Sequence, residues 1–144
     1  MPSRVYRSAR SIGTRRADSV VELAVILRRF EAPDETRHLE HGVFQLVHIG
    51  GMSIGRATYQ PGWKWSKHVG PALGLTRCSV EHVGLVLSGV VTAAFDDGTI
   101  MELRAGELFY IPPLPHDSWV VGDRVRVAAF FRRTAVRQIG PRRA

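Results

Sequence analysis

Short apolar runs separated by turn signals make up most of the chain after Pro33. These runs are rich in Val, Ile, Phe, Tyr and Thr, the residue types that favour strands. The spacing predicts an all-β sandwich or jelly roll, because nothing in the pattern alternates helix with strand as a parallel sheet does. The turn signals are Gly50-Gly51, Pro61-Gly62, Gly70-Pro71, Asp96-Asp97-Gly98, Ala105-Gly106 and Gly122-Asp123.

The N-terminal part follows a different pattern. Ser19 and Glu22 are spaced as in a capping box, an apolar stripe follows as far as Leu27, and Arg28 and Arg29 suit the C-terminus of a helix. We therefore expect a short helix over residues 18–30 and a β-barrel domain over residues 31–133. Residues 1–17 and 134–144 are expected to be a flexible basic arm and a basic tail.

The positive charge lies at the two ends of the chain. The net charge is +7, yet residues 1–16 and 132–144 hold five Arg each and no Asp or Glu, so the remainder carries −3. Polybasic segments attract polyanions without sequence specificity, but no aromatic platform or DNA-binding motif accompanies these. Nucleic-acid binding is therefore not the expected function.

Other sequence features limit where the protein works. Cys78 is the single cysteine, which excludes an intramolecular disulfide and suits a reducing compartment. The longest apolar runs are far shorter than a membrane span, and residues 1–16 show no apolar core of a signal peptide. We expect a cytoplasmic protein without a membrane span.

Three histidines are the candidate metal ligands: His68, His82 and His116. Neutral imidazole binds Zn, Cu, Fe and Ni well, and three such ligands leave coordination positions for water or substrate. Sequence alone does not select among Zn, Fe, Ni, Mn and Cu. A lone His is more often a hydrogen-bonded core or surface residue, and this interpretation is preferred for the remaining histidines.

The spacing around these histidines resembles the two motifs of the cupin family. Gly62, five residues and His68 match the start of the first motif, and His82, six residues and Gly89 match its end. Gly70 stands where the motif has its second His, and His82 stands where it has a Glu.

The second motif is represented by Gly106, five residues and Pro112, with Leu114 in place of its Gly and His116 one position early. The resemblance covers roughly residues 30–132 and is greatest with small single-domain bacterial cupins. It implies a cupin-type double-stranded β-helix and a metal set of His68, His82 and His116, with Asp117 as a competing ligand.

The two-residue period of a strand extends the set of site candidates. If His82 faces inward, Gly84 and Val86 share its face and Glu81 points away. Cys78 has the right parity to be an additional ligand, but four extended residues span ~13 Å, so joint ligation with His82 needs a bend.

Substrate-pocket candidates come from the segment around Pro61. Lys64 shares the face of His68 on an extended strand, and Arg56 and Gln60 share one face of the preceding strand. For Arg56 and Gln60, an outward-facing strand face is an equally good interpretation. Three placements are open for the tryptophans Trp63, Trp65 and Trp119: the mouth of a pocket, the core or a dimer interface.

Two functions are compatible with this sequence. The first is a divalent-metal-dependent enzyme, a dioxygenase, isomerase or lyase, acting on a small metabolite in the barrel. The alternative is a non-catalytic cupin domain that senses a metabolite or a metal. The sequence identifies no catalytic residue. Apolar side chains that point away from the face of His82, such as Leu85 and Leu87, predict a homodimer formed through the sheet.

Overall fold

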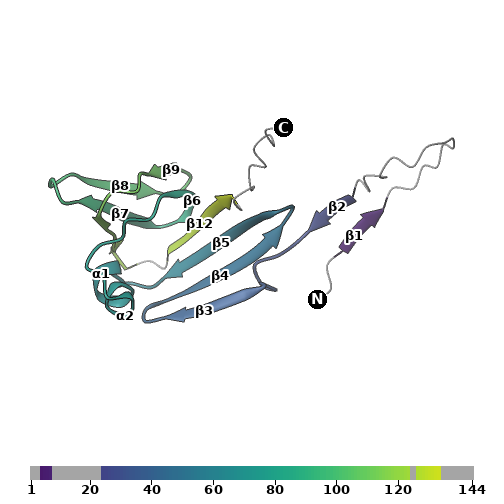
Figure 1. The fold of residues 1–144 in the computed structure, drawn as a ribbon, viewed down its shortest axis with the longest axis horizontal. Coiled ribbons are helices and arrows are strands. Elements are labelled where there is room, and N and C mark those ends of the chain that lie inside the picture. Colours follow the sequence, from purple (N-terminus) through teal and green to yellow (C-terminus); the bar gives the residue numbers. More distant parts are fainter. Residues whose placement is uncertain (1–3, 8–23, 124–125, 134–144) are drawn as a thin grey trace, which may run out of the picture.

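A computed structural model of the chain describes residues 4–7, 24–123 and 126–133. Its described strands form two sheets and a separate two-stranded ribbon, and two one-turn helices lie at one end (Figure 1). In chain order the elements are β1 (Arg4–Arg7), β2 (Ala24–Leu27), β3 (Glu35–Leu39), β4 (Gly42–Ile49), β5 (Met52–Tyr59), α1 (Trp65–His68), α2 (Gly70–Leu73), β6 (His82–Ser88), β7 (Val90–Phe95), β8 (Ile100–Arg104), β9 (Leu108–Ile111), β10 (His116–Asp117), β11 (Val120–Val121) and β12 (Arg126–Arg133).

The larger sheet has the strand order β3-β4-β5-β12-β6-β9, and every pairing in it is antiparallel. In the smaller sheet β7 pairs with β8, β10 and β11. The chain passes from β6 to β7 through Gly89, whose φ of 74° lies in the left-handed region that favours glycine. This turn carries the chain from one sheet to the other.

Apolar side chains from both sheets meet in the core. Val86 and Phe109 come from the larger sheet and Ala93 from the smaller one, and Phe95 packs against them. Pairing of His82 with Ile111 and of Gly84 with Phe109 places all four residues on this inner face. The predicted all-β architecture is confirmed, and so is the inward parity of His82, Gly84 and Val86.

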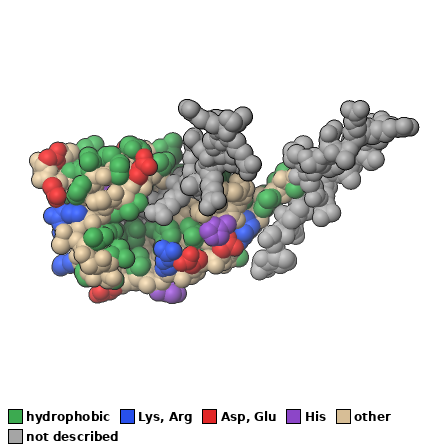
Figure 2. All heavy atoms as spheres, viewed as in Figure 1, with side chains coloured by type: hydrophobic (Ala, Val, Ile, Leu, Met, Phe, Trp, Pro, Cys, Tyr) green, Lys and Arg blue, Asp and Glu red, His purple; other side chains and the backbone are tan. Residues whose placement is uncertain are grey.

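The opposite face of β6 and β9 is apolar but exposed. Val83 pairs with Tyr110 and Leu85 with Leu108, and Leu108 has 78% of its surface accessible. Figure 2 shows hydrophobic side chains at the surface over the part of the molecule where Figure 1 draws β6 to β9. This face has no covering partner in the described part of the chain.

The predicted helix over residues 18–30 is wrong for its described part. Ala24–Leu27 is the strand β2, which pairs with β1 in an antiparallel ribbon that extends away from the two sheets (Figure 1). The β-branched Val25 and Ile26 suit a strand, and cross-strand hydrogen bonds replace those of a helix. Residues 18–23, most of the predicted arm and the predicted tail lie outside the described residues.

Candidate metal centre

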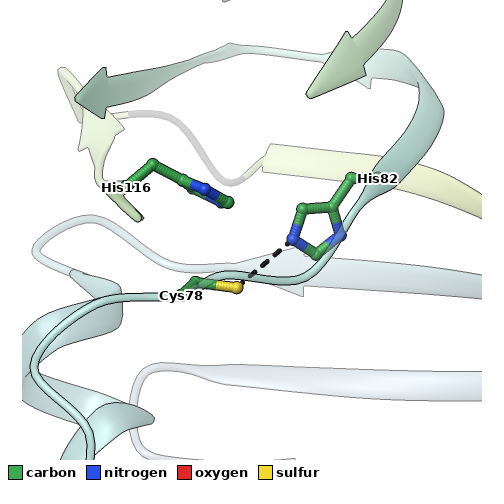
Figure 3. A group of neighbouring side chains, drawn as sticks. All are labelled: Cys78, His82 and His116. Carbon is green, nitrogen blue, oxygen red and sulfur yellow. Dashed lines mark hydrogen bonds between the residues drawn. The ribbon is translucent and has the colours of Figure 1, made fainter. Parts of the chain in front are cut away.

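Three side chains from separate segments converge between the sheets (Figure 3). Cys78 lies in the loop after α2, His82 begins β6 and His116 begins β10. We call these three residues the ligand triad, because the Sγ atom and one nitrogen of each ring all lie within 4.8 Å of one another. Cys78 is 5% exposed and His116 2%, whereas His82 is half-buried, so the triad is shielded from solvent on all but the His82 side.

Backbone pairing brings Cys78 to His116. The N–H of each residue donates to the carbonyl oxygen of the other, both at 2.9 Å, in an isolated antiparallel bridge. Residues 79–81 form no strand, and the Sγ atom of Cys78 lies 3.4 Å from Nε2 of His82, so the extended distance of ~13 Å does not separate the two side chains. The two donor atoms therefore meet, as joint ligation requires.

A second hydrogen bond sets the tautomer of His116. Its Nδ1 lies 2.7 Å from the carbonyl oxygen of Leu114, and because a carbonyl only accepts, Nδ1 must carry the proton. In the neutral ring Nε2 then keeps its lone pair. A backbone carbonyl on the far nitrogen is the usual partner of a metal-binding His.

The donor set fits a metal ion of tetrahedral preference. The Sγ of Cys78 and the Nε2 of His82 are 3.4 Å apart. A thiolate about 2.3 Å and an imidazole about 2.0–2.1 Å from a tetrahedral Zn would be roughly 3.5 Å apart. The geometry of the triad thus matches one edge of such a site without movement of the side chains.

The third predicted histidine, His68, is placed elsewhere. Its ring lies 4.7 Å from that of His41, and these two rings form a separate group with Glu40. The Nδ1 of His68 accepts the backbone N–H of Lys64 at 2.9 Å, so a neutral ring carries its proton on Nε2. That tautomer has no lone pair free for a metal, which makes this second group a poor site.

Local structure explains why His68 departs from the expectation. The prediction that His68 shares a face with Lys64 assumes an extended strand, but Trp65–His68 forms the single helical turn α1 and Gly70 begins α2. A Cβ at Gly70 would lie 2.3 Å from the carbonyl oxygen of Leu75, so no side chain fits there. The position at which the cupin motif has its second His therefore cannot hold one in this backbone.

Asp117 and Lys64 hold the backbone around α1. One carboxylate oxygen of Asp117 accepts the backbone N–H groups of Ser66 and Ser118 at 3.0 and 2.9 Å, and the other accepts the Ser66 hydroxyl at 2.8 Å. Lys64 lies 3.4 Å from the same carboxylate and 5.1 Å from the Trp119 ring. Asp117 does not belong to the ligand triad, since it alternates in direction with His116.

The charge of Asp117 is stabilised although the side chain is buried. Burial by itself raises the pKa of this carboxyl, but the hydrogen bonds from Ser66 and Ser118 and the nearby Lys64 together hold the pKa below its ordinary value of 3.8. Asp117 is thus a carboxylate that caps α1 and ties it to β10.

Arg56 lies on the face of β5 opposite to that of the buried Ala57. It pairs with Gln45 while the fully buried Ala57 beside it faces the core. Its guanidinium donates to Gln45 at 2.8 and 3.0 Å and to Glu31 at 3.2 Å, and it lies over the Phe30 ring. The exposed Gln60 is in the turn after β5, where its carbonyl accepts the N–H of Trp63.

Two further candidates take roles within the protein. Trp63 is buried rather than at a dimer interface, and its ring stacks on Tyr59 with centroids 3.8 Å apart. Glu81 points away from the triad, as its parity predicts, and accepts the hydroxyl of Tyr110 at 2.8 Å. That bond raises the pKa of the Tyr110 phenol.

A depression of about 490 Å³ lies where the β7–β8 turn meets the loop before β10. Phe95, whose ring is 5.9 Å from that of His116, and Leu114, whose carbonyl faces Nδ1 of His116, both line it. Asp96, Asp97, Thr99, Pro112 and Pro115 complete the lining. None of the three triad residues is among its lining residues, and Leu114 contacts His116 at Nδ1, the nitrogen opposite to Nε2.

Solved structures similar to this chain include cupin domains. A cupin-2 domain protein from Shewanella frigidimarina is 14% identical with a TM-score of 0.44, covering 73% of this chain and 85% of its own. A cupin domain from Bordetella pertussis is 13% identical with a TM-score of 0.48, covering 69% and 99%. A protein of unknown function from Rhizobium leguminosarum is 19% identical with a TM-score of 0.49, covering 64% and 80%.

No protein-family model matches the chain, and no curated protein sequence matches it. The likeness to solved structures is one of fold. The double-layered, antiparallel architecture is that of the all-β jelly roll that the strand pattern predicts. Within the described residues, no helix is both long and apolar enough to cross a membrane.

Proposed function

We propose that this cupin-fold chain binds one divalent transition metal ion through Cys78, His82 and His116 and acts on a small metabolite at that ion. The observation that carries the proposal is the buried convergence of a thiol and two imidazoles with a Sγ–Nε2 separation of 3.4 Å. The thiolate makes Zn, Fe, Ni or Cu better suited than Mn, which prefers oxygen ligands.

The residues of this chain would hold the ion as follows. Cys78 would contribute the single negative charge, and Nε2 of His116 is already directed by the Leu114 carbonyl on the opposite nitrogen. Three protein ligands leave a position for a substrate, and an ion there would supply a Lewis acid that polarises a substrate oxygen.

The alternative is a sensing domain in which the same site binds a metabolite or the metal without chemistry. It is favoured by the carboxylates near the triad, because both are engaged. Asp117 is bonded to Ser66, and Glu81 is bonded to Tyr110. Neither is directed at the site as a general base.

Metal analysis of protein purified without a His tag tests the proposal. Replacing Cys78, His82 or His116 by Ala should each lower metal affinity by about tenfold or more, since loss of even an outer-shell partner costs 10–100-fold. His68→Ala is the matched control and should keep full occupancy. Full occupancy in Cys78→Ala, or loss in His68→Ala alone, would assign the metal to another set of residues.

Turnover assays with the metal found would then separate the two functions. Multiple turnovers of a small metabolite that stop in His116→Ala would establish an enzyme. Saturable, reversible binding of a metabolite without turnover would establish a sensor.

A further inference from the structure

The β1–β2 ribbon exposes apolar side chains on both of its faces. Val25, Ile26 and Leu27 are all exposed, and successive residues of a strand point to opposite faces. Among the described residues the ribbon pairs with no further strand, and it extends away from both sheets (Figure 1). An isolated ribbon of two strands is at best marginally stable in water. The ribbon therefore needs a surface on which to pack.

The strand register defines one face of the larger sheet from β5 to β9. Arg56 on β5 and Leu85 on β6 both pair with Ala129 on β12, and Leu85 also pairs with Leu108 on β9. Directly opposed residues of antiparallel strands project from the same face. Arg56, Leu85 and Leu108 therefore lie on a single face, which is opposite to the face of the buried Ala57.

The chain that follows the ribbon covers only the β5 side of this face. The Arg56 guanidinium lies 4.9 Å from the centre of the Phe30 ring and donates to Glu31 at 3.2 Å. The ribbon thus leaves the larger sheet from the same face whose β6–β9 side is open. We call that side the open half-face, and its exposed side chains are Val83, Leu87, Leu108 and Tyr110.

The charges of the two surfaces are complementary. The ribbon belongs to a segment with five Arg and no acidic residue, residues 1–16, and two of these, Arg4 and Arg7, lie in β1. The exposed Glu81 and Glu107 directly precede β6 and β9, so carboxylates border the open half-face. Opposite charges steer two surfaces together and set their orientation. Because one chain carries both surfaces, a second copy of this chain fits the open half-face, as in a two-fold dimer.

We propose that the β1–β2 ribbon is an exchanged arm, which packs on the open half-face of a second copy of this chain and receives that copy's ribbon in return. The exchange removes both sets of apolar side chains from water at one interface. It also explains why the ribbon points away from β6 and β9 of its own chain (Figure 1). This interaction is independent of the ligand triad.

Two leucines of equal exposure provide a matched test of the arm. Leu27 in the ribbon and Leu75 in the loop after α2 are each 51% exposed. Leu27→Glu should raise the dissociation constant of the dimer by about tenfold or more, because it places a charge where an apolar side chain is buried against the partner. Leu75→Glu should leave the constant unchanged. Sedimentation of the full chain measures both, and circular dichroism reports whether each variant is folded.

Cross-linking identifies the surface that the arm contacts. An equal mixture of Ile26→Cys and Leu108→Cys is treated with a bismaleimide of flexible spacer. Each variant carries only one of the two positions, so a link from 26 to 108 joins two different chains. Peptide mass spectrometry should find this link. The wild type is the control, since its single Cys78 is buried and should stay unlinked.

The proposal requires both results. A dimer that lacks the link from 26 to 108, or that Leu27→Glu does not weaken, would overturn the arm and leave a dimer formed by the sheets alone. A link from 26 to 108 within one chain of the double variant Ile26→Cys, Leu108→Cys, at the mass of a monomer, would show that the ribbon packs on its own chain. A wild type that is monomeric at every concentration would also overturn the exchange.

Discussion

Cys78 and His116 face each other across two reciprocal backbone hydrogen bonds of 2.9 Å. In an antiparallel pair, directly opposed side chains project from the same face, so this bridge alone places the thiol beside the imidazole. His82 then approaches from the other sheet, and its Nε2 lies 3.4 Å from Sγ. The ligand triad thus depends on two sheets that are held together by the core.

Acidification should release the metal. Only a thiolate and neutral imidazoles coordinate, so protons compete with the ion for all three ligands of the triad. We expect the metal content after dialysis to fall as the pH is lowered while far-ultraviolet circular dichroism still reports a folded protein. Retention of the full metal content under acidic conditions would argue for ligands other than thiolate and imidazole.

Replacing Asp117 by Asn should destabilise the fold. The substitution removes the charge from an acceptor of three hydrogen bonds within a buried environment, so we expect a loss of about 1–3 kcal/mol in the free energy of unfolding. Urea denaturation measures it. Asp123→Asn, at an exposed position, is the control and should change little.

The effect of Asp117 should also depend on pH. Because the pKa of this carboxyl is lowered in the folded state, its contribution to stability is complete above the ordinary value of 3.8 and is lost as the pH falls through the folded pKa. The difference in the free energy of unfolding between the wild type and Asp117→Asn should therefore become smaller only in strong acid. A difference that is already gone at neutral pH would contradict this role.

Gly70→Ala should be destabilising although Ala is the better helix former. The added Cβ would lie 2.3 Å from the Leu75 carbonyl oxygen and 2.8 Å from the Trp65 ring, so the backbone must shift at a cost of about 1–3 kcal/mol. Thermal unfolding measures the change. Ser79→Ala, at an exposed loop position, is the control and should leave the Tm unchanged. An unchanged Tm for Gly70→Ala would show that the backbone of α2 can shift at little cost in stability.

The exposed face of β6 and β9 should form a homodimer interface. Leu108 and Tyr110 stand on the edge strand of the larger sheet, where a second copy can cover both the apolar side chains and the strand edge. Light scattering at micromolar concentrations should give twice the chain mass, and Leu108→Glu should give one chain mass. A monomer at every concentration would contradict this prediction.

The sequence by itself predicted the architecture well because strands leave a local pattern. The alternation around His82 identified Gly84 and Val86 as inward-facing, and the core contains Val86 as expected. The pattern failed at Ala24–Leu27, where the apolar stripe fits a helix as well as a strand. Pairing with Arg4–Arg7, a contact distant in sequence, decided in favour of a strand.

The candidate site was only partly accessible from the sequence. His82 and His116 were identified from their spacing, and Cys78 was given the right parity, but its distance from His82 assumed an extended chain. His68 was expected on a strand, and that expectation could not take account of Asp117, whose carboxylate is 51 positions away from Ser66 and holds α1 in place.

The sequence determined which residues have ligand chemistry, because side-chain type is a local property. Only the tertiary structure decided which of them meet. The bridge between Cys78 and His116 joins positions 38 residues apart, and the carbonyl that directs the His116 ring is a backbone group with no signature in residue type. Contacts made through the backbone of distant segments depend on the closed arrangement of both sheets, and no period along the chain encodes them.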